Sequence, residues 1–232
     1  MEKQFDDRTK LLIGENNLNI LKAKKVAVCG NGGVGSIIPL ALLRSGIYKF
    51  VLVDFDRVDN SNLNRQFAYT MDDVGRCKVD SLSSHMQQLR KEVEIDMVFS
   101  KINNDFDFKI FDNCDYVFDC IDDIGAKVLL IKYCKDHDIK IISSLGMGNR
   151  LDPTKVVITK LNKTTIDPLA KKLRYLLKEN GVDISNVVVS FSLEKPIIKD
   201  RVVSSMVFTP NASGLAMASY ALRDMLNIME EK

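Results

Sequence analysis

The chain has 232 residues, of which 46% are hydrophobic and 28% are charged, and its formal net charge is +2. This is enough to bury the core of one large α/β domain or two small ones, and it gives no overall signal for binding a polyanion. Residues 150–201, however, carry eleven lysines and arginines against six acidic residues, a difference of +5. That imbalance fits a surface facing nucleic acid, and it fits a solvated lysine face equally well.

The termini and the cysteines bear on where the protein works. The N-terminal stretch MEKQFDDRTK lacks the apolar core of a signal peptide, and no apolar run is long enough to cross a bilayer. The five cysteines are odd in number and form no CxxC pair. We therefore expect a cytoplasmic protein without a membrane span, with reduced, buried thiols and without a disulfide frame or zinc site.

The first elements lead into a glycine-rich loop. Residues 8–22 predict two short helices interrupted by Gly14, with Arg8 on the surface. The stretch VAVCGNGGVGS at residues 26–36 is typical of a buried parallel strand that enters a helix through a loop that binds phosphate. The loop alone does not distinguish NAD, FAD and ATP, and a tight turn without a ligand has the same pattern. Its glycines are Gly30, Gly32, Gly33 and Gly35.

The rest of the chain alternates strands and helices, which predicts an α/β fold with a Rossmann-like, doubly wound, mostly parallel sheet and helices on both faces. The expected strands are 25–29, 50–53, 94–99, 115–120, 139–143, 156–159, 187–191 and 202–208. The expected later helices are 33–45, 74–91, 126–137, 168–180 and 215–229. We expect one domain, residues 1–232, with a nucleotide-binding core at 25–150 and a C-terminal β/helix elaboration at 151–232.

Polar residues follow the second predicted strand. Asp54 lies 19 residues after Gly35, close to the spacing at which a Rossmann fold places an acid on a ribose hydroxyl. The run at 59–66 contains amides and Arg65, whose guanidinium suits a triphosphate. Lys78 lies in the first turn of a predicted helix, against the helix dipole, and a nearby anionic ligand explains this placement, as does a tolerated surface lysine.

Carboxylates and histidines are the remaining candidates. Asp122 and Asp123 follow the strand at 115–120, and acidic residues near phosphates predict a magnesium ion held partly by water. His85 and His137 have no serine or cysteine partner in the pattern, so we expect neither to be catalytic.

Five motifs follow one another in the order GNGGVGS, LVDFD, SNLNRQ, VGRCK and DCIDD. In this order and spacing they resemble the ubiquitin-activating-enzyme-like, or ThiF-type, adenylating enzymes. The resemblance implies that a carboxylate attacks the α-phosphate of magnesium-bound ATP, giving an acyl-adenylate and pyrophosphate. ATP is then a substrate consumed in turnover.

Further stretches cover about residues 5–228 and include RTKLLIGE, SSLGMGNRLDPT, KTTIDPLAKKLR, VVSFSLEKP and TPNASGLAMAS. They resemble the bacterial tRNA threonylcarbamoyladenosine dehydratases within that superfamily. This implies a ligase-class enzyme that cyclises threonylcarbamoyladenosine in tRNA through a carboxyl-adenylate and releases AMP and pyrophosphate. It implies a homodimer, and it leaves open a monovalent cation and a sulfur-transfer or cysteine-desulfurase partner.

The resemblance also assigns roles to residues. Asp54 holds the ribose, Asp122 holds magnesium, and Arg8 reaches the ATP of the partner subunit. Arg65 and Lys78 stabilise charge during attack at the α-phosphate, which makes Arg8, Arg65, Lys78 and Asp122 the expected catalytic residues. The expected ATP site comprises Gly30, Gly32, Gly33, Gly35, Asp54, Asp56, Ser61, Asn62, Arg65, Gln66 and Lys78.

Two alternatives remain. One is an adenylyltransferase that activates the C-terminal Gly-Gly of a sulfur-carrier protein, although those enzymes often carry CxxC zinc pairs that this chain lacks. No cysteine follows Cys134, so a thioester step of the ubiquitin type is not expected. The other is an NAD-binding oxidoreductase or nucleotide-sensing module, which fits the glycine loop and Asp54 but leaves SNLNRQ and VGRCK unexplained.

Overall fold

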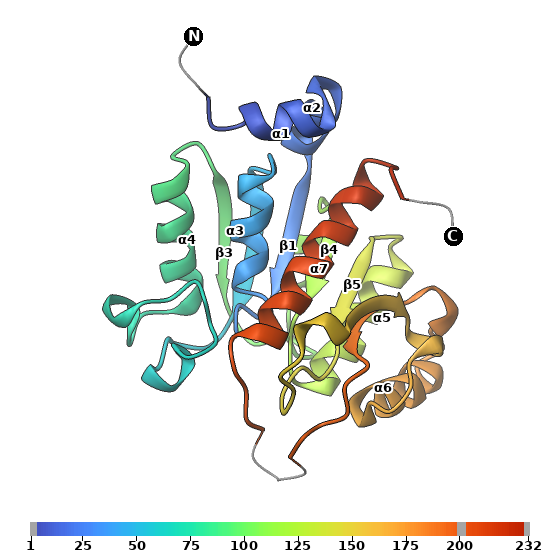
Figure 1. Cartoon of the computed structure of the whole chain (residues 1–232). Helices are drawn as coiled ribbons and strands as arrows, with labels where there is room; N and C mark the ends of the chain where they lie inside the picture. The colour runs from blue at the N-terminus through green and yellow to red at the C-terminus, as the bar shows by residue number, and fades with distance from the viewer. Residues whose placement is uncertain (1–3, 199–202, 230–232) are drawn as a thin grey trace.

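The computed structural model describes residues 4–198 and 203–229, and its strands form one mostly parallel sheet (Figure 1). Along the sheet the order is β3-β2-β1-β4-β5-β7-β6, and only β6 is antiparallel to its neighbour, β7. The bounds are β1 Lys25–Cys29, β2 Lys49–Asp54, β3 Glu94–Phe99, β4 Tyr116–Asp119, β5 Ile141–Ser144, β6 Val156–Lys160 and β7 Val188–Ser192. The predicted doubly wound, mostly parallel sheet is confirmed.

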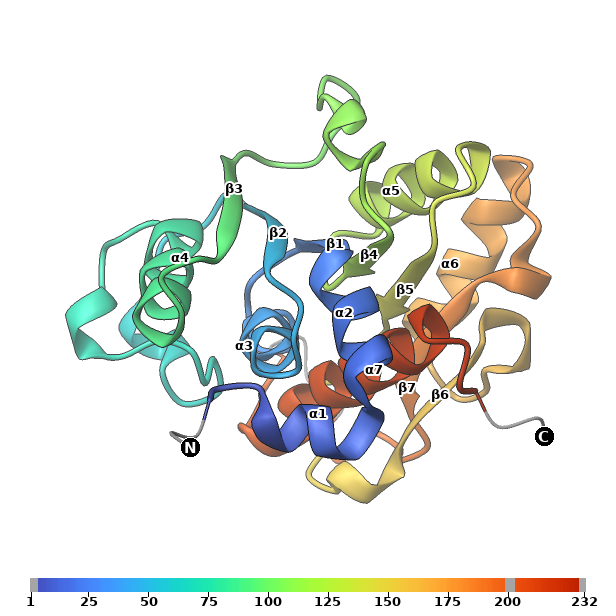
Figure 2. The ribbon, with the colours of Figure 1, turned by 90° about the horizontal axis from the view of Figure 1, so that it is seen from above.

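The helices cover both faces of this sheet. In Figures 1 and 2, α3, α4 and α7 lie on one side, and α5 and α6 lie on the other. The bounds are α1 Asp7–Ile13, α2 Glu15–Ala23, α3 Ile37–Arg44, α4 Lys78–Leu89, α5 Ile124–Asp136, α6 Pro168–Glu179 and α7 Phe208–Met225. Short 3-10 turns lie at η1 Asn60–Asn62, η2 Met71–Asp73, η3 Phe108–Phe111, η4 Pro153–Lys155, η5 Leu161–Lys163 and η6 Ile184–Asn186.

Strand β2 shows why the sheet is buried on both sides. Side chains of a strand point alternately to its two faces. Phe50 and Leu52 belong to the apolar cluster under α3, α4 and α7, whereas Val51 and Val53 belong to the cluster under α5 and α6. A continuous apolar run is therefore needed here, because each face packs against its own layer of helices.

The C-terminal segment differs from the prediction in its expected strand and in the start of its helix. The expected strand at 202–208 is wrong, because residues 203–206 have no regular secondary structure and α7 begins at Phe208, while Val202 lies outside the described residues. Helix α7 also starts seven residues before the expected position 215. Glycine at position 214 serves packing, since a Cβ on Gly214 would lie 2.4 Å from the carbonyl oxygen of Val34.

Strands β7 and β6 follow β5 at one edge of the sheet, so the C-terminal part of the chain extends the sheet of the preceding strands. The division of a single domain into parts 25–150 and 151–232 stays a prediction. Helix α3 begins later than expected, at Ile37, because residues 33–36 are part of the turn. Within residues 4–198 and 203–229, no helix is long and apolar enough to span a bilayer.

Candidate active site

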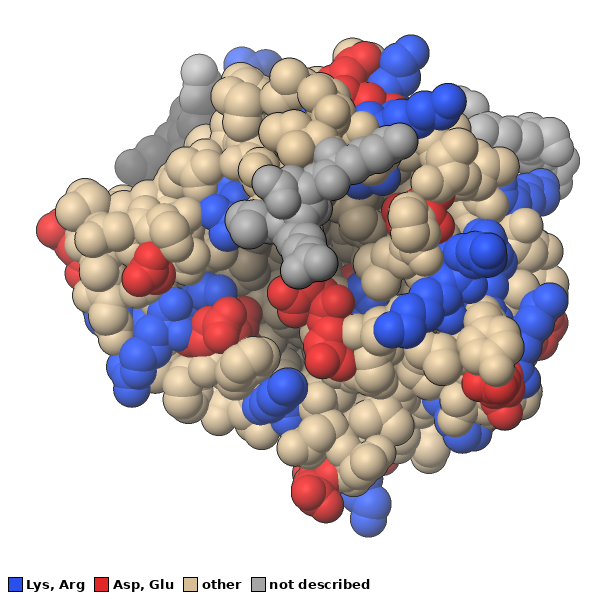
Figure 3. All heavy atoms as spheres, turned by 90° about the horizontal axis from the view of Figure 1, so that it is seen from below, with Lys and Arg blue, Asp and Glu red and all other residues tan. Residues whose placement is uncertain are grey.

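A cavity of about 680 Å³ lies at the carboxyl edge of the sheet. Here β1 and β4 are neighbours, and the chain proceeds from β1 toward β3 on one side and from β4 toward β5 on the other. Parallel sheets bind ligands at such a reversal of strand order. Figure 3 shows the molecule from below, the side on which Figure 1 places the carboxyl ends of the strands. Acidic and basic side chains flank a central hollow there.

The glycines of the loop after β1 fall into two groups. Gly30 has φ +84°, and a Cβ there would lie 2.7 Å from the carbonyl oxygen of Cys120. A Cβ on Gly35 would lie 1.8 Å from the carbonyl oxygen of Gly30, so backbone packing requires glycine at both positions. At Gly32 and Gly33 the nearest atoms would be 3.7 and 3.4 Å away, which are ordinary contacts. Both line the cavity, so their lack of a side chain leaves the backbone open to a ligand.

Asp54 is fixed at the end of β2. Its side chain accepts hydrogen bonds from the backbone N–H of Asn31, at 2.5 Å, and of Asp56, at 2.8 Å. Burial raises the pKa of the Asp54 carboxyl, and nearby Lys78 and these two N–H groups partly offset that rise. The buried hydroxyl of Tyr69 donates to the carbonyl of Asn31, at 2.8 Å, which ties the glycine loop to the segment between η1 and η2.

Lys78 is the first residue of α4 and faces a carboxylate. Its Nζ lies 2.8 Å from Oδ2 of Asp56, and its backbone N–H donates to the Asp56 carbonyl at 3.0 Å. The Lys78 side chain is only 6% exposed. The side chain therefore adds a buried positive charge to the N-terminus of a helix, where an anion binds most favourably. Lys78 is therefore not a surface lysine, and its charge is paired with Asp56 at the wall of the cavity.

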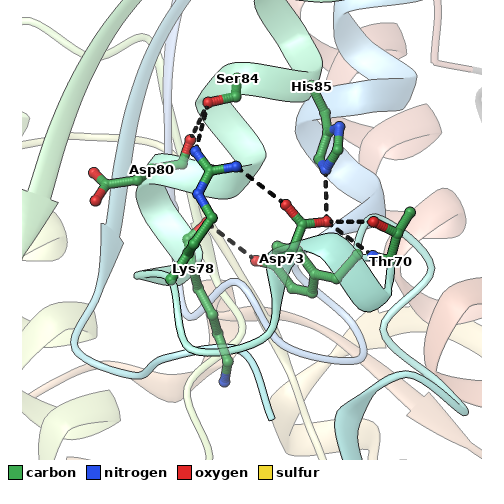
Figure 4. Close-up of polar contacts among 8 residues, drawn as sticks. Thr70, Asp73, Lys78, Asp80, Ser84 and His85 are labelled. Atoms are coloured by element: carbon green, nitrogen blue, oxygen red, sulfur yellow. Dashed lines mark hydrogen bonds and ion pairs between the residues drawn. The ribbon is translucent and has the colours of Figure 1, made fainter. Parts of the chain in front are cut away.

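The segment before Lys78 is anchored through Asp73 (Figure 4). The buried Asp73 carboxylate accepts hydrogen bonds from the Thr70 backbone N–H, at 2.8 Å, and hydroxyl, at 3.0 Å. It also contacts Nε2 of His85 in α4, at 2.8 Å, and Nη1 of Arg76 at 3.4 Å. Asp73 thus joins η2 to the second turn of α4, and this fixes where that helix begins. His85 does not line the cavity.

Arg65 follows η1 and lines the cavity beside Gly33. Its Nη1 donates to the Ser61 carbonyl at 2.7 Å and to Oδ1 of Asn64 at 2.9 Å. Its own carbonyl accepts a hydrogen bond, at 2.9 Å, from Nδ2 of Asn211 in α7. The adjacent Gln66 is buried. A helix more than a hundred residues away therefore holds the backbone that presents this guanidinium.

The loop after β4 carries exposed carboxylates above a buried ion pair. Asp122 and Asp123 line the cavity, and Oδ1 of Asp123 caps α5 by accepting from the Ala126 N–H at 2.9 Å. Beneath them, Oδ2 of Asp119 lies 3.0 Å from Nζ of Lys127, and both side chains are fully buried. Because Asp123 is used as a cap and Asp119 is paired, Asp122 is the carboxylate of this loop that can face a ligand.

The carboxylates of this cavity suit one way of binding a magnesium ion. Across the described chain, no group of three or more His, Cys, Asp or Glu side chains is arranged to hold a metal. Magnesium bound with a nucleotide usually takes one or two protein carboxylates and completes its coordination with phosphates and waters. An exposed carboxylate at Asp122, in the same cavity as Gly32 and Gly33, fits that mode, whereas a metal caged entirely by protein ligands would not.

Most of the residues expected in the site line this cavity, but three do not. Those that do are Gly30, Gly32, Gly33, Asp54, Asp56, Asn62, Arg65, Gln66, Lys78 and Asp122. Gly35 shapes the loop from below, and Ser61 contributes only its carbonyl to Arg65. Arg8 is exposed on α1, beyond α2 and the amino end of β1, so it lies at the opposite edge of the sheet (Figure 1).

Sequence reasoning missed several lining residues. Most lie at or after the ends of β2, β3 and β5 or in the C-terminal segment: Phe55, Ser100, Lys101, Ile102, Ser144, Leu145, Gly146, Met147, Gly148, Val203, Ser205 and Pro210. The first three groups follow strands whose carboxyl ends share one edge, a signal that the predicted topology already contained. No local pattern marks residues 203–210 as cavity residues.

His137 and the cysteines were the remaining residues with reactive side chains. His137 contacts the Tyr133 carbonyl through Nδ1, at 2.9 Å, and is not among the lining residues. All five cysteines are free thiols, and burial raises the pKa of Cys29, Cys114, Cys120 and Cys134. These four thiols are therefore poor nucleophiles.

Comparison with known proteins gives consistent matches along the chain. The model of the ThiF family matches residues 7–230. The tRNA threonylcarbamoyladenosine dehydratase of Bacillus subtilis is 37% identical over 251 positions, covering 100% of this chain and 98% of that protein. Among solved structures, the tRNA N6-threonylcarbamoyladenosine dehydratase of E. coli with ATP aligns with a TM-score of 0.90 and 31% identity, over 95% of this chain and 93% of that chain. Its complex with AMP gives a TM-score of 0.89 and 30% identity, over 97% and 98%.

Proposed function

This chain belongs to the ThiF family, and we propose on that basis that it uses ATP to cyclise threonylcarbamoyladenosine in tRNA. One observation carries the proposal beyond family membership. The phosphate-facing glycines, the buried Lys78 and the guanidinium of Arg65 line one cavity at the carboxyl edge of the sheet. Two cations and an open backbone suit the phosphates of a nucleotide.

In the proposed reaction, the carboxylate of the threonylcarbamoyl group attacks the α-phosphate and pyrophosphate leaves. An atom of the same threonylcarbamoyl group then attacks the activated acyl carbon, and AMP leaves with one former carboxylate oxygen. The ring is closed with net loss of water, while ATP is converted to AMP and pyrophosphate. Lys78 and Arg65 would stabilise the charge that develops during the first attack, and Asp54 would orient the ribose.

We assign the magnesium ion to the Asp122 side of the cavity. Magnesium would supply charge neutralisation on the triphosphate. Asp122 is exposed and precedes the capping residue Asp123, so its carboxylate can turn toward phosphates without loss of the α5 cap. For tRNA, the excess of basic residues at 150–201 supports a polyanionic substrate. A reaction on tRNA would place the protein in the cytoplasm.

We also propose a homodimer in which Arg8 serves the site of the partner subunit. Helix α1 buries none of its residues, and Leu11 and Leu12 are 78% and 84% exposed. Apolar exposure of this size on a short helix supports an interface. Arg8 lies at the edge of the sheet opposite its own cavity, so it can contribute to a site only in another subunit.

The substrate is tested by measuring AMP and pyrophosphate release with tRNA that carries threonylcarbamoyladenosine. We expect release of both, in step with cyclised nucleoside detected by mass spectrometry. Turnover that is equal with unmodified tRNA would contradict the assignment. Pyrophosphate exchange that requires the Gly-Gly terminus of a sulfur-carrier protein would support the adenylyltransferase alternative, and selective binding of NAD over ATP would support the oxidoreductase one.

The roles of Asp122 and Arg8 have separate tests. Asp122→Asn should abolish turnover at low magnesium and leave the unfolding midpoint unchanged, and a fully active variant would exclude the magnesium role. Arg8→Ala and Lys78→Met should each be inactive. Mixed dimers of the two would contain one intact site, so an equal mixture should regain about a quarter of wild-type activity if Arg8 acts in trans. No recovery on mixing would contradict that arrangement.

A further inference from the structure

Helix α6 carries an exposed basic face that the adenylation chemistry does not use. Ala170, Leu173 and Leu177 are buried against the rest of the protein. Lys171, Lys172, Tyr175 and Lys178 are exposed, at the spacing that places side chains along one face of a helix. This face is defined here as the α6 lysine face.

The charges on this face are not balanced by the described protein. In residues 4–198 and 203–229, none of Lys171, Lys172 and Lys178 forms an ion pair with a carboxylate. Between residues 168 and 178 the exposed face has no acidic residue. Glu179, at the end of the helix, accepts a hydrogen bond from the Tyr175 hydroxyl. In Figure 3 a large group of basic side chains lies to the right of the hollow, the side on which Figure 1 places α6.

The α6 lysine face begins at the cavity. Leu169, the second residue of α6, lines the cavity. Asp167 caps the helix by accepting from the N–H groups of Leu169 and Ala170, at 2.8 and 3.3 Å. Its Oδ2 lies 3.8 Å from Nη2 of the buried Arg150, whose Nη1 donates to the carbonyl of the cavity-lining Gly148 at 3.1 Å. The helix is therefore fixed to the cavity wall and extends about 15 Å from it to Lys178.

We propose that the α6 lysine face binds the RNA backbone next to the nucleotide that enters the cavity. The inference rests on the proposed function, since it takes tRNA as the substrate. A nucleotide held in the cavity places its neighbouring phosphates within reach of a surface that starts at the cavity rim. Three unpaired lysines supply the charge for those phosphates, and the 61% exposed ring of Tyr175 offers a surface on which an unstacked base can lie.

The test compares two variants with the same loss of charge. The first is Lys171→Gln/Lys172→Gln/Lys178→Gln. The control is Lys91→Gln/Lys109→Gln/Lys140→Gln, which removes exposed lysines that precede β3, β4 and β5 and do not line the cavity. The probe is fluorescently labelled tRNA carrying threonylcarbamoyladenosine, with binding followed by anisotropy over a range of salt concentrations. ATP affinity is measured by calorimetry in parallel.

The α6 variant should bind this tRNA about tenfold more weakly, and the slope of log affinity against log salt should fall by about 2. The control should bind like the wild type, and both variants should keep wild-type ATP affinity. Tyr175→Ala should weaken binding about fivefold without changing the salt slope, because stacking does not release counterions.

The proposal is overturned if the α6 variant and the control bind tRNA alike, which is also the result expected if this face serves an acidic protein instead. Failure of the proposed function would give a different result from failure of the α6 proposal. In that case the wild type would bind tRNA without releasing AMP, whatever the behaviour of the α6 variant.

Discussion

Nζ of Lys127 lies 3.0 Å from Oδ2 of Asp119, and neither side chain is exposed to solvent. The other carboxylate oxygen of Asp119 accepts a hydrogen bond from the Ile121 N–H at 3.2 Å. This pair joins the end of β4 to the second turn of α5 beneath the loop that carries Asp122. An ion pair without water costs desolvation energy, so its presence here points to control of the loop geometry more than to stability.

Removing one partner of this pair should be more damaging than removing both. Lys127→Met leaves an uncompensated buried carboxylate and should lower the free energy of unfolding by about 3–5 kcal/mol. Asp119→Leu/Lys127→Met should be less destabilised than Lys127→Met alone. Urea unfolding measures the free energy of unfolding of each variant. The single variant Asp119→Leu completes the comparison. A double variant whose loss of unfolding free energy equals the sum of the losses in Asp119→Leu and Lys127→Met would contradict this account.

The exposed pair Lys132–Asp136, at 2.7 Å, is a matched control for the buried one. Lys132→Met should cost less than about 1 kcal/mol, because solvent screens an exposed pair.

Alanine at two glycines of the same loop should have opposite consequences. Gly35→Ala places a Cβ 1.8 Å from the Gly30 carbonyl oxygen, so it should yield unfolded or insoluble protein. Gly32→Ala meets only the Gln66 amide, at 3.7 Å, and should keep the wild-type unfolding midpoint while ATP binds at least about tenfold more weakly. Calorimetry with ATP and circular dichroism separate the two effects. Unchanged ATP affinity in Gly32→Ala would exclude a phosphate site at that position.

Lys78→Met should reduce AMP formation by about 100-fold or more, since removal of a preorganised charge from a developing oxyanion typically costs this much. Its partner Asp56 is 49% exposed and is solvated once the lysine is gone, so the fold should survive. The measurement is steady-state AMP release together with thermal unfolding. Lys91→Met, which removes an exposed lysine far from the cavity, should leave the rate unchanged. A rate near wild type in Lys78→Met would rule out the assigned role.

The stability supplied by Asp73 should depend on pH. Burial raises the pKa of this carboxyl, but hydrogen bonds from Thr70 and the contact with His85 outweigh it, so the pKa lies below its usual range. The ionised group therefore stabilises the fold above the pKa of an unfolded aspartate, about 4. This contribution is lost as the pH falls through the lower folded-state pKa.

Asp73→Asn removes that titration. The difference in unfolding free energy between the wild type and this variant should be largest near about pH 6 and should shrink toward about pH 3. Urea titrations at both pH values measure it. A difference that stays constant with pH would show that the Asp73 carboxylate is not the source.

The fold was largely predictable, but parts of the site were not. Strands such as 25–29 and 94–99 are marked by short local patterns, and these bounds agree with β1 and β3. The start of α7 was not predicted, and Pro210 and Gly214 are residue types that are common in turns. Their place in α7 is set by a long-range contact, where Gly214 lets that helix approach the Val34 carbonyl. Such a contact leaves no trace in the neighbouring residues.

By itself the sequence determined the order of strands and helices, the glycine-rich loop and the family motifs, because strand alternation and glycine spacing act over only a few residues. Only the tertiary structure decided that Gly35 supports the loop while Gly32 faces the cavity, that Asp119 is paired with Lys127, and that Asn211 holds the backbone of Arg65. These relationships depend on which strand lies beside which and on which helix covers them. Packing across the whole sheet settles that order, and no stretch of the chain encodes it alone.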